Sequence, residues 1–259
     1  MLPLKGAGNW RAHTLSGFTE SEELMEFKIK MFADGADLEE IRIFAQNSLV
    51  AGFTTNPTLM RKAGIDDYIR FSRQALEIVF PKPISFEVFS DDLQEMTEQA
   101  RTISDWGTNV YVKIPVTNTT GVSTTEILSQ LSSEGIKLNV TALTTLAQVQ
   151  EVMSSLVPSV PAIISVFAGR IADTGLDPIP VMTQAKRVIE SNQYAELLWA
   201  SPREILNLVQ AEDMNCDIIT MTSDLWKKIP GLGKDLTQLS RETVKMFFDD
   251  AVASNYSVI

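Results

Sequence analysis

Short apolar runs alternate with longer amphipathic stretches along the chain from residue 28 onward. The runs are continuous in apolar residues and bracketed by Gly, Pro, Asp or Asn, a pattern typical of strands buried on both faces of a parallel sheet. The predicted strands are Ile29–Ala33, Leu49–Phe53, Ile84–Phe89, Asn109–Ile114, Ile136–Val140, Ala162–Phe167, Glu196–Ala200 and Asp217–Met221. Eight such strands favour a closed barrel over an open sheet, which usually has fewer.

The stretches between these runs carry apolar residues at three- and four-residue spacing, as amphipathic helices do. Helix start signals support this interpretation, because Asp37 precedes Leu38 and Ser201-Pro202 precedes Arg203. Predicted helices include Leu38–Ala45, Leu93–Trp106, Thr124–Glu134, Leu143–Leu156 and, at the C-terminal end, Leu236–Ala251 with an apolar face.

The order of these elements predicts a single-domain (β/α)8 barrel, or TIM barrel. Eight βα units in roughly 230 residues match the ~250 residues typical of this fold. The length of 259 residues would also suit two small domains, but no linker interrupts the pattern. Neither a G-x-G-x-x-G motif nor a Walker loop occurs. We therefore expect an N-terminal extension (1–27) and a catalytic barrel with a C-terminal helix (28–259).

The charge and hydropathy of the chain exclude several kinds of partner. A net charge of -11 argues against nucleic acid and against an anionic membrane, because both require a basic surface. No apolar run approaches the ~18–20 residues that span a bilayer, and the N-terminus lacks the apolar core of a secretory signal. We expect a cytoplasmic homo-oligomer that acts on small molecules.

Cysteine and histidine are nearly absent, which narrows the possible chemistry. Cys216 is the single cysteine and lies in an apolar run, so we expect a buried, inert thiol. His13 is the single histidine and lies in the polar N-terminal tail. Zinc sites and Ser-His-Asp or Cys-His enzymes need a well-placed imidazole. The sequence therefore predicts a site without metal or cofactor, built from lysine, carboxylates, hydroxyls and amides.

Polar residues at the carboxyl ends of the predicted strands are candidates for the site, because barrels place their active sites there. These residues are Asp34, Thr54, Thr55, Asn56, Glu87, Lys113, Asn139, Thr141, Ser165, Arg170, Ser201, Arg203 and Thr220. One amine, two carboxylates, several amides and hydroxyls and two arginines would converge on one face. Such a set suits a Schiff-base enzyme that acts on a phosphorylated polyol.

Lys113 is the most informative of these positions, because it lies inside the apolar run VYVKIPV. Burial disfavours the ammonium form, and the uncharged amine is the nucleophile in Schiff-base chemistry. The alternative is a structural lysine paired with a carboxylate. The pattern alone leaves both open.

Asp34 and Glu87 end two different predicted strands. Schiff-base sugar chemistry needs proton transfer at two places, which two separate carboxylates could serve. Asp34 could instead be a helix N-cap, and Glu87 a paired structural carboxylate. Arg170 and Arg203 follow the sixth and seventh strands, where barrels often bind phosphate. Either arginine could also be an ordinary surface residue.

Seven segments together resemble the transaldolase family, in the order in which that family has them. They are FADGADLEEI, GFTTNPTLM, SFEVF, VYVKIPVT, LNVTALTTLAQ, ISVFAGRIAD and WASPREI. The resemblance covers nearly all of residues 28–251, and the length and the TVKMFFDDA tail are similar to the short, bacterial-type branch. It implies transfer of a dihydroxyacetone unit from fructose 6-phosphate or sedoheptulose 7-phosphate to an aldose phosphate, within the pentose phosphate pathway.

The resemblance also implies a role for each catalytic residue. Lys113 would form the Schiff base, and Asp34 would take the C4-hydroxyl proton during C3–C4 cleavage. Glu87 and Thr141 would hold the water that moves protons during dehydration of the carbinolamine.

The substrate-binding roles follow in the same way. Asn56 and Asn139 would bond the ketose hydroxyls, Ser165 would help to position the sugar, and Phe167 would line the substrate-binding site. The terminal phosphate would be held by Arg170, Ser201 and Arg203.

Three alternatives stay open. Fructose-6-phosphate aldolases of the same superfamily resemble a pattern with glutamine at position 87 and tyrosine at 167, whereas this chain has Glu87 and Phe167. A modified sugar phosphate could be the substrate, because GRIADTG lacks the usual acid directly after the isoleucine and SPR replaces the commoner S-F-R. A barrel that only binds sugar phosphate is the third, although binding alone needs no buried lysine.

Overall fold

The structure, a computed structural model, describes residues 27–256 and 258. Within these residues, eight parallel strands form a closed barrel in which each strand pairs with the next and β8 pairs with β1. The strands are β1 (Lys30–Asp34), β2 (Val50–Thr54), β3 (Ile84–Glu87), β4 (Val110–Pro115), β5 (Leu138–Leu143), β6 (Ala162–Val166), β7 (Ala195–Trp199) and β8 (Ile218–Met221). The predicted (β/α)8 barrel is confirmed.

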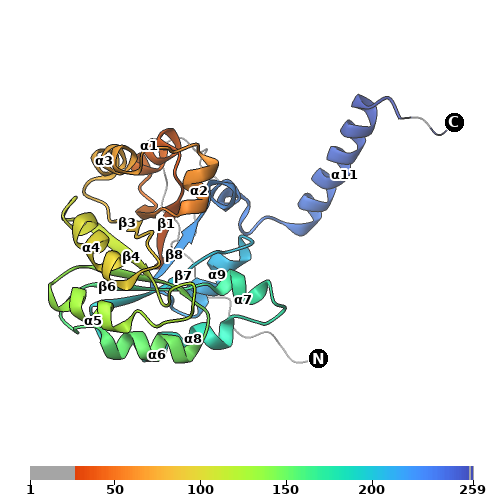
Figure 1. The fold of residues 1–259 in the computed structure, drawn as a ribbon. Coiled ribbons are helices and arrows are strands. Elements are labelled where there is room, and N and C mark those ends of the chain that lie inside the picture. Colours follow the sequence, from red (N-terminus) through yellow and green to blue (C-terminus); the bar gives the residue numbers. More distant parts are fainter. Residues whose placement is uncertain (1–26, 257, 259) are drawn as a thin grey trace.

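Helices surround this barrel (Figure 1). They are α1 (Leu38–Gln46), α2 (Pro57–Lys62), α3 (Tyr68–Val79), α4 (Leu93–Ser104), α5 (Thr125–Ser133), α6 (Leu146–Ser155), α7 (Ala168–Ala172), α8 (Ile179–Ile189), α9 (Leu206–Asp213), α10 (Ser223–Trp226), the short 3-10 helix η1 (Ile229–Gly231) and α11 (Leu236–Ala253). Asp37 caps α1 as predicted, because its Oδ1 accepts from the N–H groups of Glu39 and Glu40.

The apolar residues form two clusters, one on each side of the sheet. The larger cluster fills the space between the strands and the surrounding helices. The smaller one lies inside the barrel and consists of Phe32, Ile163, Leu198, Ala200 and Ile218. Apolar side chains fill this part of the barrel interior, and polar side chains lie at the carboxyl ends of the strands.

Gly52 makes room for the largest of these interior side chains. A Cβ at this position would lie 2.5 Å from the Phe32 ring, closer than such atoms come in real structures. The register between β1 and β2 also shifts beside Phe32. A side chain at position 52 would therefore displace the ring that fills the barrel interior.

Some predicted boundaries are wrong. Leu143, the predicted start of a helix, is the last residue of β5, which runs beyond the predicted limit of Val140. The helix starts later because Thr145 and Gln148 form a capping box that fixes the N-terminus of α6. The signal at Ser201-Pro202 is also misplaced, since α9 begins only at Leu206.

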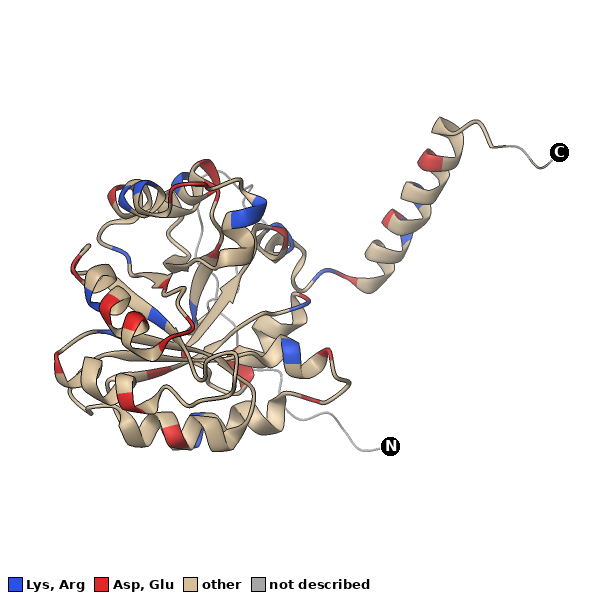
Figure 2. Cartoon of the chain, in the orientation of Figure 1, with Lys and Arg blue, Asp and Glu red and all other residues tan. Residues whose placement is uncertain are grey.

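Helix α11 has the predicted extent to within two residues, but no part of the barrel covers its apolar face. The helix stands away from the barrel (Figure 1), and acidic and basic residues alternate along it (Figure 2). Its exposed apolar residues are Leu236, Leu239, Val244, Met246, Phe247, Phe248 and Val252. In the part of the chain that the structure describes, no helix is long and apolar enough to cross a membrane. Residues 1–26 of the predicted extension, with His13, lie outside the described residues.

Candidate active site

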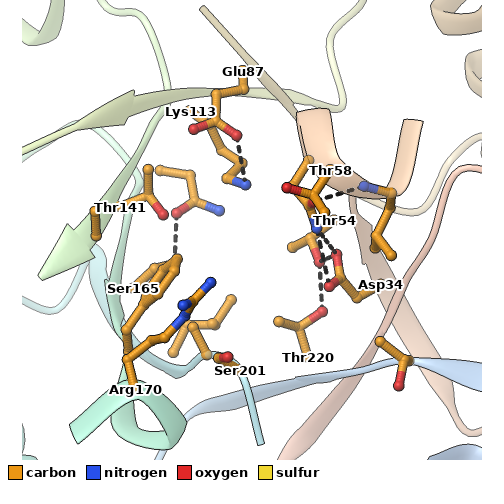
Figure 3. Close-up of a pocket in the computed structure, with 18 of the residues that line it drawn as sticks. Asp34, Thr54, Thr58, Glu87, Lys113, Thr141, Ser165, Arg170, Ser201 and Thr220 are labelled. Carbon is orange, nitrogen blue, oxygen red and sulfur yellow. Dashed lines mark hydrogen bonds and ion pairs between the residues drawn. The ribbon is translucent and has the colours of Figure 1, made fainter. Parts of the chain in front are cut away.

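The carboxyl ends of the strands enclose a cavity of about 410 Å³ (Figure 3), a size typical of small-molecule sites. All eleven residues predicted to bind or react with substrate line it. They are Asp34, Asn56, Glu87, Lys113, Asn139, Thr141, Ser165, Phe167, Arg170, Ser201 and Arg203. Thr54, Thr58, Thr220 and Thr222 also contribute to the lining.

The strand register brings the central residues to one level of the barrel. Glu87 on β3 pairs with Lys113 on β4, which in turn pairs with Asn139 on β5. Asn139 is fully buried: its amide donates to Ser85 Oγ at 2.9 Å, and its Oδ1 accepts from Ser165 Oγ at 2.6 Å. Adjacent strands therefore hold these groups rigidly beside the lysine.

Lys113 is only 7% exposed and has two fixed partners. Its Nζ donates to the backbone carbonyl of Thr55 at 2.8 Å and to Glu87 Oε2 at 3.1 Å. The expected burial is thus confirmed, and so is a carboxylate partner. A proton passed from the ammonium to Glu87 would leave an uncharged amine at the cavity surface.

Asp34 lies on the other side of the cavity from Ser165 and Thr141 (Figure 3). Its Oδ1 accepts from Thr54 Oγ1 at 2.8 Å, and Thr54 Oγ1 in turn lies 2.6 Å from Thr220 Oγ1. The amide of Asn56 is 3.3 Å from Oδ2. Because Asp37 caps α1, the alternative of Asp34 as the N-cap is wrong.

Burial raises the pKa of Asp34, and the negative charge of Glu87 adds to this effect. The positive charge of Lys113 and the hydrogen bonds from Thr54 and Asn56 act in the opposite direction. The group therefore titrates above the usual range of an aspartate, as suits a carboxylate that exchanges a proton with a substrate hydroxyl.

Thr141 offers an unused hydroxyl at the lysine end of the cavity. It is buried, and its Oγ1 has no hydrogen-bond partner among the described residues. Buried polar groups of this kind ordinarily bind water or a ligand. Thr141 pairs with Pro115 at the end of β4, two residues beyond Lys113, and it lines the same cavity as Lys113 and Glu87.

The two arginines lie across the cavity from Lys113, and their surroundings differ. The guanidinium of Arg170, on α7, has no hydrogen-bond or ion-pair partner within residues 27–256 and 258. Arg203 donates from Nε to Asp173 Oδ1 at 3.0 Å and from Nη2 to Oδ2. Both arginines line the cavity, so the alternative that either one is an ordinary surface residue is wrong.

The loop that carries Arg203 differs from the predicted helix N-terminus. The N–H groups of Arg203 and Glu204 both donate to Asn207 Oδ1, at 2.7 and 3.1 Å, so neither is available to bind phosphate. Ser201 has a φ of 59°, in the left-handed region that a non-glycine residue rarely adopts. A Cβ at position 169 would lie 1.5 Å from the carbonyl oxygen of Ser201, so only glycine fits there.

Sequence reasoning missed two residues at the arginine end, Asp173 and Asn207. Both contact Arg203 and do not line the cavity themselves. The position of Asp173 shortly after Arg170, which was predicted to bind phosphate, was the only signal in the sequence.

Cys216 is buried, as predicted, and does not line the cavity, and burial raises the pKa of its thiol to about 12. The described residues include no cluster of His, Cys, Asp and Glu that could hold a metal ion.

The fold and the cavity define the class as a (β/α)8 barrel with a buried lysine and two carboxylates at the carboxyl ends of its strands. The family model "Transaldolase/Fructose-6-phosphate aldolase" matches residues 31–257. The chain therefore belongs to the transaldolase/fructose-6-phosphate aldolase family, and the resemblance found in the sequence is confirmed.

Named relatives agree with this assignment. A "Probable transaldolase" from Streptococcus equi subsp. zooepidemicus is 35% identical over 202 residues, which are 78% of this chain and 90% of that protein. A "Probable transaldolase" from Dehalococcoides mccartyi is 33% identical over 194 residues, 74% of this chain and 86% of the relative. One from Streptococcus pyogenes is 33% identical over 225 residues, 86% and 97% of the two chains.

Proposed function

We propose that this protein is a transaldolase that moves a dihydroxyacetone unit between sugar phosphates through a Schiff base on Lys113. The donor would be fructose 6-phosphate or sedoheptulose 7-phosphate, and the acceptor an aldose phosphate. The observation that carries the proposal is the buried amine of Lys113, 3.1 Å from Glu87, in a cavity that the Thr141 hydroxyl, without a partner among the described residues, also lines. No metal or organic cofactor is needed for this chemistry.

The first half of the reaction would take place at the lysine end. The uncharged amine adds to the ketose carbonyl and gives a carbinolamine, whose hydroxyl leaves as water when it is protonated. Glu87 and Thr141 are suited to hold the water that carries this proton, since one offers a charged acceptor and the other an unused hydroxyl. The product is the iminium ion on Lys113.

Cleavage of the C3–C4 bond would follow at Asp34. This carboxylate takes the proton of the C4 hydroxyl, the bonding electrons flow into the iminium ion, and an enamine of dihydroxyacetone remains on Lys113. The aldose phosphate leaves, the acceptor aldehyde enters, and the same steps run in reverse. Asn56, Asn139 and Ser165 would bind the hydroxyls, and Arg170, Ser201 and Arg203 the phosphate.

An aldolase that releases free dihydroxyacetone is the second candidate. Glu87 and Phe167 favour the transferase, because the aldolase branch resembles a pattern with glutamine and tyrosine at these positions. Both residues line the cavity, so either could influence the fate of the enamine. A modified sugar phosphate as substrate is a third option, supported by Ala172 and by Pro202 at the phosphate end.

The test is to trap the intermediate. Borohydride added with fructose 6-phosphate should attach dihydroxyacetone covalently to Lys113, and mass spectrometry should locate it there. Lys113→Met should lower transfer by at least about 10³-fold, whereas the exposed-lysine control Lys227→Met should not. An adduct on another residue, or an active Lys113→Met variant, would contradict the proposal. Activity with and without erythrose 4-phosphate separates the transferase from the aldolase.

We also propose that the protein assembles with further copies of itself. The exposed apolar residues of α11 support this, because a helix of this composition gains stability only when another surface covers it. Sugar phosphates are charged and do not cross membranes unaided, so we place the reaction in the cytoplasm, in the pentose phosphate pathway.

A further inference from the structure

Asp173 follows the short helix α7 and lies beside one of the two arginines of the cavity. It is the C-cap residue of that helix. Its carboxylate accepts two hydrogen bonds from the guanidinium of Arg203. Arg203 lines the cavity and Asp173 does not, so the carboxylate contacts the guanidinium from outside the cavity.

The contact divides the donors of Arg203 into two sets. A guanidinium has five N–H donors in a planar fork. Asp173 takes one on Nε and one on Nη2, which leaves the edge formed by Nη1 and Nη2 for a ligand. The backbone N–H of Arg203 is bound by Asn207, so both the backbone and the side chain of this residue are held.

The neighbouring loop is fixed as well. The N–H of Gly169 donates to the carbonyl of Ala200 at 3.3 Å, and Gly169 packs directly against the carbonyl of Ser201. Arg170, on α7, and Arg203, on the loop after β7, therefore project from two segments that are in contact with each other. The charge of Arg170 is uncompensated within the described residues, whereas the charge of Asp173 balances that of Arg203.

We propose that Asp173 is a positioning residue that holds Arg203 so that its free edge binds the single phosphate monoester of the sugar together with Arg170. This inference rests on the proposed function, which makes a phosphate the ligand at this end of the cavity. Arg170 supplies most of the attraction, and Arg203, held by Asp173, fixes the orientation of the phosphate.

Inorganic phosphate is the probe, and its affinity is measured from the rise in melting temperature that it causes, because a ligand of the folded state stabilises it. Asp173→Asn should weaken phosphate binding about two- to fivefold when Arg203 is present, the range expected for an exposed ion pair. In an Arg203→Ala background the same substitution should not weaken binding, since Asp173 acts only through Arg203. Glu190→Gln, at the opposite end of the barrel, is the control for a change of one charge.

Tighter phosphate binding by Asp173→Asn would overturn the inference, because the carboxylate would then be a competitor of phosphate. Equal weakening in both backgrounds, or no effect of phosphate on the wild-type melting temperature, would also overturn it. Partial recovery in Asp173→Glu would support it, as would a raised KM for the phosphorylated ketose with unchanged kcat. Phosphate binding needs no turnover, so failure of the Lys113 trap leaves this test intact and the two results remain distinguishable.

Discussion

At the lysine end of the cavity the charged groups sit on strands and are tied to fixed partners. At the arginine end they sit on loops and a short helix and reach the cavity on long, exposed side chains. The side chain of Lys113 is 8% exposed, whereas that of Arg203 is 44% exposed. The difference matches the demands of each task, because atoms that form and break bonds tolerate far less displacement than a charge that attracts phosphate.

Glu87→Gln tests the lysine end and should have the largest effect. The amide keeps the size of the side chain and most of its hydrogen bonds, but it cannot relay a proton. We expect transfer to fall by about 10²–10⁴-fold, the usual contribution of a general acid or base, with ketose binding preserved. Single-turnover transfer and ketose affinity, measured on one preparation, check this.

The contrary outcome is a structural Glu87. The substitution would then lower the melting temperature, because Lys113 would lose its charged partner, and the transfer rate per folded molecule would stay near wild type. A gain in free dihydroxyacetone release would instead support the catalytic role, given the glutamine of the aldolase branch.

Replacement of the arginines tests the other end and should change KM more than kcat. Arg170→Ala should raise KM for phosphorylated substrates roughly 10- to 150-fold, as expected for loss of a charged hydrogen bond. Arg203→Ala should raise KM less than Arg170→Ala does, because Asp173 compensates the charge of Arg203 and solvent screens that charge. Equal effects would show that the ion pair with Asp173 does not lower the contribution of Arg203. The same rise in KM for free dihydroxyacetone, which has no phosphate, would show that the arginines do not act on the phosphate.

Thr54→Val makes a finer change beside Asp34. The hydroxyl of Thr54 lowers the pKa of Asp34, so its removal should raise that pKa further. Asp34 must be ionised to accept the C4-hydroxyl proton, and activity therefore rises with pH through its pKa. The acid limb of the kcat/KM profile should move to higher pH. Thr55→Val, whose hydroxyl bonds the carbonyl of Ser85 instead, should leave the limb in place.

Substitutions on α11 should have the smallest effect on the chemistry. Phe247→Glu with Phe248→Glu places charge on the exposed apolar face, and we expect smaller assemblies in analytical ultracentrifugation. Turnover should change less than about threefold, since α11 does not line the cavity. Unchanged assembly would contradict self-association through this helix. A large loss of turnover would mean that a second copy completes the site.

The sequence was sufficient to predict the lysine end because its residues belong to the regular part of the fold. Once eight strands are recognised, the polar residues at their ends must meet, and Glu87, Lys113 and Asn139 fall at one level through the strand register. The apolar surroundings of Lys113 also predicted its burial.

The arginine end could not be predicted in the same detail. Asp173 and Asn207 contact Arg203 across loops whose paths depend on the left-handed turn at Ser201 and the contact with Gly169. No periodicity encodes these features. The direction of α11 was equally out of reach, because an apolar face predicts that a helix is covered and not what covers it.

The register of β4 has a consequence for insertions and deletions. Side chains alternate between the two faces of a strand, so a shift of β4 by one residue relative to β3 would turn Lys113 toward the helices and bring Val112 or Ile114 to the cavity. The hydrogen-bonded barrel could still close after such a slip, although the amine would be lost from the site. Single-residue insertions within β4 should therefore separate the ability to fold from the ability to react, whereas insertions in the preceding connection, at the far end of the barrel, should preserve both.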